Sequence, residues 1–192
     1  MAKKPNLMSQ MFPDTWYKRA FMRAPILLWR LGLGRLMGKD LLLLSHIGRK
    51  SGQVRRAVIE CHRDANGHKY APSGYGPRSQ WYQNIQVNPI VTIQSSDGTE
   101  LMHARRVTED AEIAKIYDLL KEKHPNMLQL YAERLGLEMD KAAFITHKDQ
   151  VYFVAFDPSQ ETAAFPLKAD LVWLWFLLAV LIGLLIIILV SP

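Results

Sequence analysis

The sequence predicts an α+β domain, built as a small closed or split β-barrel with flanking helices, and one C-terminal transmembrane helix after it. The barrel is predicted by short strand-like runs between turn signals in residues 41–107, with a further run at 151–156. Helical periodicity in residues 109–135 adds the α component. The transmembrane helix is predicted by residues 171–190, which contain no polar or charged side chain.

The N-terminal segment, residues 16–38, has a helical pattern with two interruptions. Pro25 starts or kinks a helix because proline lacks an N–H, and Gly32 and Gly34 weaken its end. Apolar and basic residues are mixed along the segment, which is typical of a helix that lies on a membrane surface. A helix packed on its own domain with solvated arginines explains the pattern equally well.

The first strands are predicted by apolar runs. Residues 41–45 form a continuous apolar run, which predicts a buried strand, and residues 57–61 predict a second strand. A turn signal at residues 64–67 lets residues 68–71 return as a hairpin. Pro72 limits the returning strand to an edge or a bulge, because proline cannot donate to the ladder.

A second hairpin follows. Residues 91–94 are a β-branched strand, and Asp97-Gly98 is a strong hairpin turn that leads into a strand at residues 100–107. The expected order is therefore a helix, four or five antiparallel strands, helices, and the last strand at 151–156.

Two helices follow these strands. Residues 109–123 place apolar side chains at helical spacing, with acidic residues near the start. Residues 125–135 do the same and end at Gly136. The predicted parts of the chain are a basic amphipathic segment (1–38), the barrel domain (39–158), a linker (159–170) and the transmembrane helix (171–190).

The apolar segment 171–190 has the length of a membrane span. At 1.5 Å per residue its helix would extend about 30 Å, the thickness of the hydrocarbon core. Trp173 and Trp175 lie near one end, where indole rings prefer the interface. All 24 Lys and Arg residues precede the segment, so the domain should stay on the cytoplasmic face of the cell membrane. The alternative is a core helix, but a core helix of this length normally has a polar face.

Composition narrows the function classes. The net charge of +6 suits anionic lipid head groups, an anionic cofactor or nucleic acid, but the basic residues are scattered and no nucleic-acid motif is present. Cys61 is the only cysteine, and its place in a predicted strand favours a packed, inert thiol over a reactive one. The six histidines lack the spacing of a helical zinc motif, so no metal site is predicted.

The first candidate site is the basic stretch at residues 48–56, Gly-Arg-Lys-Ser-Gly-Gln-Val-Arg-Arg, directly after a predicted strand. Glycines let backbone N–H groups converge, and Arg and Lys add charge-assisted hydrogen bonds. Such a loop would hold a phosphate or a carboxylate, although it lacks the spacing of a P-loop. A solvated basic turn explains the composition equally well.

The second candidate site is the stretch at residues 73–84, in which glycines flank Tyr75 and a Trp-Tyr pair follows. Close backbone approach and flat side chains suit a planar ring ligand. A turn packed by core aromatic residues is the alternative.

Together the two stretches resemble the deazaflavin-dependent nitroreductase and quinone reductase family. The resemblance lies in LLLLSHIGRKSGQVRR (41–56), SGYGPRSQWYQNIQVNP (73–89) and the strand Val-Thr-Ile (91–93), and extends from about residue 31 to 158. It implies a split β-barrel of the FMN-binding-like type that uses the 8-hydroxy-5-deazaflavin coenzyme F-420 (coenzyme F420). The C-terminal transmembrane helix is not part of the usual family pattern.

The resemblance also implies residue roles. The basic loop would grip the phosphate and acidic glutamyl tail of the coenzyme, the Ser-Gly-Tyr-Gly segment would run beside the deazaflavin ring, and the Trp-Tyr-x-Asn signature would pack against or line the pocket. The cofactor-binding residues implied in this way are Gly48, Arg49, Lys50, Ser51, Gly52, Arg55, Arg56, Ser73, Gly74, Tyr75, Gly76, Trp81, Tyr82 and Asn84. Many members carry Thr-Pro in place of Ala57-Val58, and the stretch before Trp81 is shorter here, which leaves the substrate open.

The function implied is that of a membrane-anchored oxidoreductase that transfers a hydride from reduced deazaflavin to a quinone-like or nitroaromatic acceptor. Its expected partners are membrane lipids and a lipid-soluble acceptor but no nucleic acid, and a homodimer is left open. Tyr75, Tyr82 and Tyr131 are all candidates for the proton donor, and no catalytic residue is assigned. The alternatives are a split-barrel reductase that uses FMN, and a non-catalytic carrier of a cofactor or fatty acid at the membrane.

Overall fold

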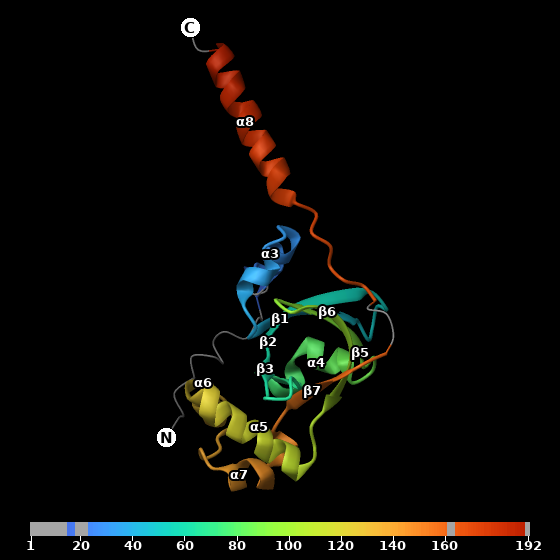
Figure 1. Ribbon diagram of the computed structural model, residues 1–192, viewed down its shortest axis with the longest axis vertical. Helices are drawn as coiled ribbons and strands as arrows, with labels where there is room; N and C mark the ends of the chain where they lie inside the picture. Colours follow the sequence, from blue (N-terminus) through green and yellow to red (C-terminus); the bar gives the residue numbers. More distant parts are fainter. Residues whose placement is uncertain (1–14, 18–22, 161–163, 191–192) are drawn as a thin grey trace.

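The centre of the computed structural model, which describes residues 15–17, 23–160 and 164–190, is one antiparallel sheet (Figure 1). The strand order is β2-β1-β5-β6-β7-β4-β3. The strands are β1 (Leu41–Ile47), β2 (Val54–Glu60), β3 (His62–Arg63), β4 (Lys69–Pro72), β5 (Ile90–Ser95), β6 (Gly98–Arg106) and β7 (Phe153–Pro158).

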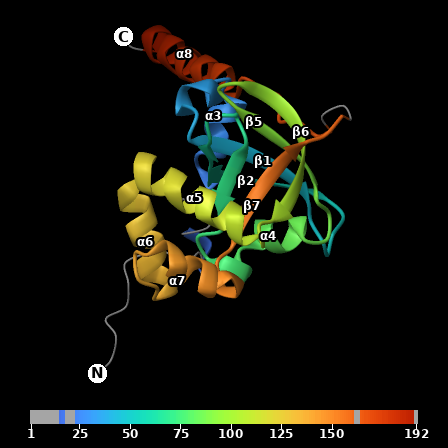
Figure 2. The same ribbon diagram turned by 60° about the horizontal axis from the view of Figure 1, so that its bottom comes forward.

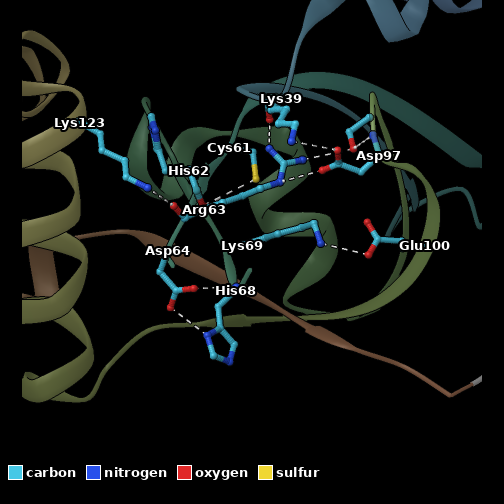
Figure 3. Close-up of polar contacts among 11 residues, drawn as sticks. Lys39, Cys61, His62, Arg63, Asp64, His68, Lys69, Asp97, Glu100 and Lys123 are labelled. Carbon is cyan, nitrogen blue, oxygen red and sulfur yellow. Dashed lines mark hydrogen bonds and ion pairs between the residues drawn. The ribbon is translucent and has the colours of Figure 1, made fainter. Parts of the chain in front are cut away.

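The sheet curls back on itself. β2 and β3 stand at opposite ends of the strand order, yet only Cys61 separates them along the chain. Polar contacts near this junction join strands that are distant in the order (Figure 3). Arg63 of β3 lies 3.3 Å from the carboxylate of Asp97 in the β5–β6 turn, and Lys69 of β4 pairs with Glu100 of β6 at 3.0 Å.

Three helices pack together on one side of the sheet (Figure 2): α5 (Asp110–Lys123), α6 (Pro125–Leu135) and α7 (Lys141–Thr146). Their apolar side chains form a hydrophobic core with those of β7 and β4, in which Ile113, Phe144 and Phe153 are fully buried. A second cluster fills the inside of the curled sheet and includes Leu42, Leu44 and Ile93. Burial of these apolar side chains is the main stabilising term of the fold.

The expected strands and both long helices are confirmed, and the differences concern short elements. The sheet has seven strands where four or five and a last one were expected, and the additional strand is β3, which has only two residues. α7 was not predicted, and residues 80–85 form a helix, α4 (Gln80–Ile85), where only a turn was considered. Pro72 pairs with Phe153 at the end of β4, beyond the reach of the short β3, as an edge position requires.

The N-terminal segment holds α3 (Ile26–Arg30) and a 3₁₀ turn, η1 (Gly34–Met37), while residues 18–22 of the expected helix lie outside the described part. Pro25 is the N-cap of α3. Trp29 is buried against Gly34, where a Cβ would come within 2.5 Å of the indole. α3 therefore packs on the domain through Trp29 but leaves other apolar side chains exposed.

The last helix, α8 (Val172–Val190), is long and apolar enough to cross a membrane. Its window Trp173–Val190 has a mean hydropathy of 3.1, and none of it is buried inside the molecule. This exposure contradicts the alternative of a core helix.

Candidate functional site

A cavity of about 850 Å³ lies between α3, the β1–β2 loop, β2 and α4. Its lining combines basic residues with apolar ones, and the apolar residues include Ile26, the 57–59 stretch and Trp81. Its lining residues are Arg23, Ile26, His46, Gly48, Arg49, Lys50, Ser51, Val54, Arg55, Arg56, Ala57, Val58, Ile59, Tyr75, Arg78, Ser79, Gln80, Trp81 and Asn84. Six of these are Lys or Arg, and none is Asp or Glu.

The β1–β2 loop is a tight turn that carries much of this charge. The Gly48 N–H donates to the Gln53 carbonyl at 2.8 Å, and the Gly52 N–H donates to the Gly48 carbonyl at 2.8 Å. Gly52 has a φ of +66°, and a Cβ on Gly48 would lie 2.9 Å from the Ser51 hydroxyl. The two glycines therefore allow a turn from which Arg49 projects toward α4.

Arg49 is tied to α4 by side-chain amides. Its backbone N–H and its guanidinium both donate to the Asn84 Oδ1, at 3.1 and 2.9 Å. The guanidinium also donates to Gln80 at 3.3 Å and to Gln83. Because all three acceptors are neutral, Arg49 fixes the loop without losing its net charge.

The other cations of the loop and β2 are likewise not neutralised within the described residues. None of Arg49, Lys50, Arg55 and Arg56 lies within 4.0 Å of a described Asp or Glu carboxylate. Unneutralised cations on a concave wall create a positive potential that attracts an anionic ligand. The cavity can therefore bind a molecule with several negative charges.

The Trp-Tyr-x-Asn signature divides between the two sides of α4. Trp81 and Asn84, three residues apart, line the cavity. Tyr82 and Ile85 are buried in the core inside the sheet, where the Tyr82 ring meets that of Tyr152 edge-on with centroids 5.5 Å apart. The signature thus combines a cavity wall with an anchor for α4.

His46 is a cavity residue that sequence reasoning missed. It is 3% exposed, and burial, with a smaller effect of Arg55, lowers its pKa to about 4, so it is neutral near pH 7. Since the Asn84 oxygen already accepts from Arg49, the Asn84 amide nitrogen donates to His46 Nδ1 at 3.3 Å, which leaves the ring proton on Nε2. The available signal was alternation along β1, because His46 falls on the same face as Leu42 and Leu44.

Several predicted residues shape the site without lining the cavity, namely Gly52, Ser73, Gly74, Gly76 and Tyr82. The buried Ser73 hydroxyl donates to the Gly76 carbonyl at 2.8 Å. A Cβ on Gly76 would come within 3.1 Å of the Tyr152 ring, and its φ is +54°. These contacts hold the turn that presents Tyr75 to the cavity.

Of the three tyrosines considered as proton donors, only Tyr75 lines the cavity. Tyr82 and Tyr131 are buried, and burial raises the pKa of each hydroxyl. The Tyr131 oxygen accepts a hydrogen bond from the Tyr152 N–H at 3.0 Å, a structural contact. Cys61 is fully buried, which confirms that its thiol is packed, and burial raises its pKa to about 11.

Residues 30–139 match the family model described as F420H(2)-dependent quinone reductase. A search of curated proteins found no match. Among solved structures, an F420-H2 dependent reductase (FDR-A) is 20% identical, over 62% of this chain and 95% of that one, with a TM-score of 0.47. The haem storage protein HutZ from Vibrio cholerae is 14% identical, over 73% of this chain and 92% of that one, with a TM-score of 0.44.

Proposed function

Because the chain belongs to the F420H(2)-dependent quinone reductase family, and is thus a deazaflavin-dependent oxidoreductase, we propose that it is a membrane-anchored reductase of quinone-like or nitroaromatic acceptors. One observation carries the proposal: the lining of the cavity combines six Lys or Arg residues and no Asp or Glu with apolar residues such as Ile26, Val58 and Trp81. A coenzyme with a flat ring and a polyanionic tail matches both kinds of lining residue.

The basic residues of the lining fit the tail. Lys50, Arg55 and Arg56 line the cavity and would donate charge-assisted hydrogen bonds to phosphate and carboxylate groups. Arg49 has a different role, because it holds the loop against α4 through Asn84 while its remaining positive charge adds to the field.

The apolar residues of the lining fit the ring. Ala57, Val58 and Trp81 offer apolar surface against which a planar ring could pack, and Tyr75 lines the same cavity. The bound coenzyme supplies the hydride chemistry. Around it, the apolar residues exclude water, His46 Nε2–H offers a neutral hydrogen-bond donor, and the Tyr75 hydroxyl is the proposed proton source.

The curled sheet is proposed to be a split β-barrel. The direct passage of β2 into β3, with Cys61 alone between them, supports closure of the sheet by one continuous chain segment. We accordingly propose that residues 39–158 are the coenzyme-binding domain, that residues 159–170 are the linker and that residues 171–190 are the anchor.

The anchor suggests the acceptor class. An apolar helix with none of its length buried is suited to the lipid core, and the basic residues that precede it favour the cytoplasmic side. Confinement to the membrane raises the encounter rate only with a molecule that also dissolves in lipid. A quinone with a long hydrocarbon tail is therefore the favoured acceptor.

The test uses the full chain in lipid nanodiscs, titrated with the coenzyme and with a tailless deazaflavin. Lys50→Ala removes one charge-assisted hydrogen bond, about 1.5–3 kcal/mol, so affinity for the whole coenzyme should fall roughly ten- to a hundredfold. Affinity for the tailless ring should stay nearly constant. Lys121→Ala, an exposed lysine on α5, is the matched control and should change neither.

Equal weakening of both ligands would mean that Lys50 acts through folding, and tighter binding of FMN would refute the coenzyme assignment. In the same nanodiscs, menaquinone should oxidise the reduced coenzyme. If menaquinone, other quinones and nitroaromatics all fail to do so, a carrier that only binds the cofactor becomes the better account.

A further inference from the structure

The linker before α8 is bound to the sheet along residues 164–167. Thr92 and Gln94 lie on the outer face of β5, and both are buried. The Gln94 side chain donates to the Leu167 carbonyl at 3.0 Å and accepts from the Leu167 N–H at 2.6 Å. The Thr92 hydroxyl donates to the Ala164 carbonyl. Both polar side chains form hydrogen bonds with the linker backbone, so residues 164–167 pack over β5.

The end of the linker is fastened to α3. The Arg30 carbonyl accepts from the N–H groups of Asp170 and Leu171 at 3.0 and 3.1 Å, and the Arg30 guanidinium donates to the Asp170 carboxylate at 2.7 Å. Leu171 has a φ of +48°, a conformation that non-glycine residues keep only where surrounding contacts hold it. A Cβ on Gly32 would contact Ala169 at 3.7 Å.

These contacts place α3 and η1 beside the first turn of α8. Figures 1 and 2 show α3 next to the near end of α8, with α5, α6 and α7 at the far side of the domain. Leu27, Leu33 and Leu36 are 47%, 43% and 80% exposed in this segment. Exposed basic side chains lie in the same segment, at Arg35 and Lys39, and in the linker, at Lys168. The docking surface is defined by these residues: Leu27, Leu33, Arg35, Leu36, Lys39 and Lys168.

We propose that the fastened linker lays this docking surface on the cytoplasmic leaflet, with the leucines in the interfacial layer and the basic residues at anionic head groups. The inference rests on the proposed anchor, because α8 fixes where the bilayer begins. The leucines lie beside the point where the chain enters the membrane, and a lipid surface is the occupant that matches both the apolar and the cationic side chains.

The orientation has a consequence for the acceptor. Arg23 and Ile26 of the same segment line the cavity, and α3 packs on β2, which forms its apolar wall. A domain that lies on its α3 side therefore turns the part of the cavity that Arg23 and Ile26 line toward the bilayer. A lipid-soluble acceptor then reaches the cavity from the bilayer without passing through water.

The test measures depth in the membrane at three sites of the full chain. Leu36→Cys reports the docking surface, Leu181→Cys the middle of α8, and Met139→Cys the far side between α6 and α7. Each carries an environment-sensitive fluorophore, and the unsubstituted chain serves as the blank because Cys61 is fully buried. The nanodiscs contain equal parts of phosphatidylcholine and phosphatidylglycerol, with quenchers on lipid tails or head groups.

The expected result is quenching at Leu181 by tail quenchers, at Leu36 by head-group quenchers, and at neither depth for Met139. Quenching at Leu181 with Leu36 no different from Met139 overturns the docking while the anchor stands. A lack of quenching at Leu181 refutes the anchor itself. A Leu36 label that is shielded from water without lipid quenching also overturns the docking, and indicates a protein partner such as a second copy.

The fastening is tested by Asp170→Asn combined with Gln94→Glu, which removes the ion pair and sets a carboxylate against the Leu167 carbonyl. Coenzyme titration checks that the domain still folds. Quenching at Leu36 should fall to the level at Met139, with Leu181 unchanged. Oxidation by menaquinone should slow severalfold, whereas a water-soluble short-chain quinone should react as before. Unchanged quenching at Leu36 would refute the role of the linker.

Discussion

The region under α5 and the region around the cavity differ in whether their cations form ion pairs with carboxylates. Under α5, cations are paired with carboxylates: Arg105 contacts Glu112 and Asp157, each at 2.7 Å, and Lys115 contacts Asp64 at 2.5 Å. Around the cavity, the cations of the β1–β2 loop and β2 have only neutral partners among the described residues. The ion pairs under α5 neutralise their charges within the protein and support the fold. The cations around the cavity keep their positive potential, which can attract an anionic ligand.

The same contrast holds for apolar side chains. The helical side buries Phe144, Tyr117 and Tyr131 against one another, with the ring centroids of Tyr117 and Phe144 5.2 Å apart. The cavity side leaves Ile26 and Trp81 only partly buried. Stability is therefore expected to depend on the helical side and binding on the cavity side. Four predictions test this division.

The largest effect is expected from Phe144→Ala on the helical side. Removing a fully buried phenyl ring leaves a cavity and should destabilise the protein by about 3–5 kcal/mol. Ile26→Ala on the cavity wall should cost about 1 kcal/mol or less. Urea unfolding of the detergent-solubilised chain, followed by tryptophan fluorescence, measures both. Equal costs would mean that the cavity side is as tightly packed as the helical side.

The next effect concerns pH, with one buried histidine on each side. Burial lowers the pKa of His46 at the cavity and of His62, whose ring lies 4.5 Å from that of His124, from 6.5 to about 4. The folded protein binds fewer protons than the unfolded chain between these values. Stability should thus be highest above pH 6.5 and fall toward pH 4, by up to about 3 kcal/mol for each histidine.

Each of the substitutions His46→Gln and His62→Gln should remove the contribution of that histidine to the loss of stability, which urea midpoints between pH 7 and pH 4 measure. Bound coenzyme should change the contribution of His46, which lines the cavity, and leave that of His62 unchanged. A slope that survives both substitutions would assign the acid sensitivity to carboxylates.

The sequence predicted the long elements because their periodicity is strong. α5, α6 and the main strands follow the patterns of their own residues, and Gly136 takes the left-handed conformation expected of a helix C-cap, with a φ of 70°. β3, α7 and α4 are too short to show a period, since they have two, six and six residues. Tertiary contacts determine such short elements, and these contacts cannot be read from a local stretch of sequence.

For the site, the sequence indicated the cations but not their division of labour. Composition alone assigned Arg49 and Lys50 the same role, whereas only the fold shows that Arg49 bonds to α4 while Lys50 does not. Ile26 and His46 reach the cavity from α3 and β1, elements distant from both motifs. Their role depends on how the sheet curls, which no local pattern records.

A charge change can make the cavity resemble the helical side. Asn84→Asp keeps an oxygen acceptor for Arg49 but turns its partner into a carboxylate. Affinity for the anionic coenzyme should fall by about 1–3 kcal/mol, roughly five- to a hundredfold. Stability should fall as well, because the substitution removes the amide that donates to the buried His46, so urea midpoints are measured on the same variants. Gln129→Glu, an equal charge change on α6, is the control. Fluorescence titration of both variants measures the effect, and equal weakening by Gln129→Glu would attribute it to net charge alone.

The smallest effect is expected from two exposed lysines that differ only in their partners. Lys141 on α7 pairs with Asp118 at 2.6 Å in an exposed contact, so Lys141→Ala should cost less than about 1 kcal/mol of stability and leave coenzyme affinity unchanged. Lys50→Ala should cost no more stability, because the β1–β2 loop does not depend on it, yet it should weaken coenzyme binding. Raising the salt concentration should reduce both the stability effect of Lys141→Ala and the affinity effect of Lys50→Ala, since salt screens the interactions of exposed charges. Urea midpoints and titrations in low and high salt measure this pair. If Lys50→Ala lowers the free energy of unfolding as much as it lowers the free energy of binding, Lys50 supports the fold. The proposed difference between the cations of the two regions would then be wrong.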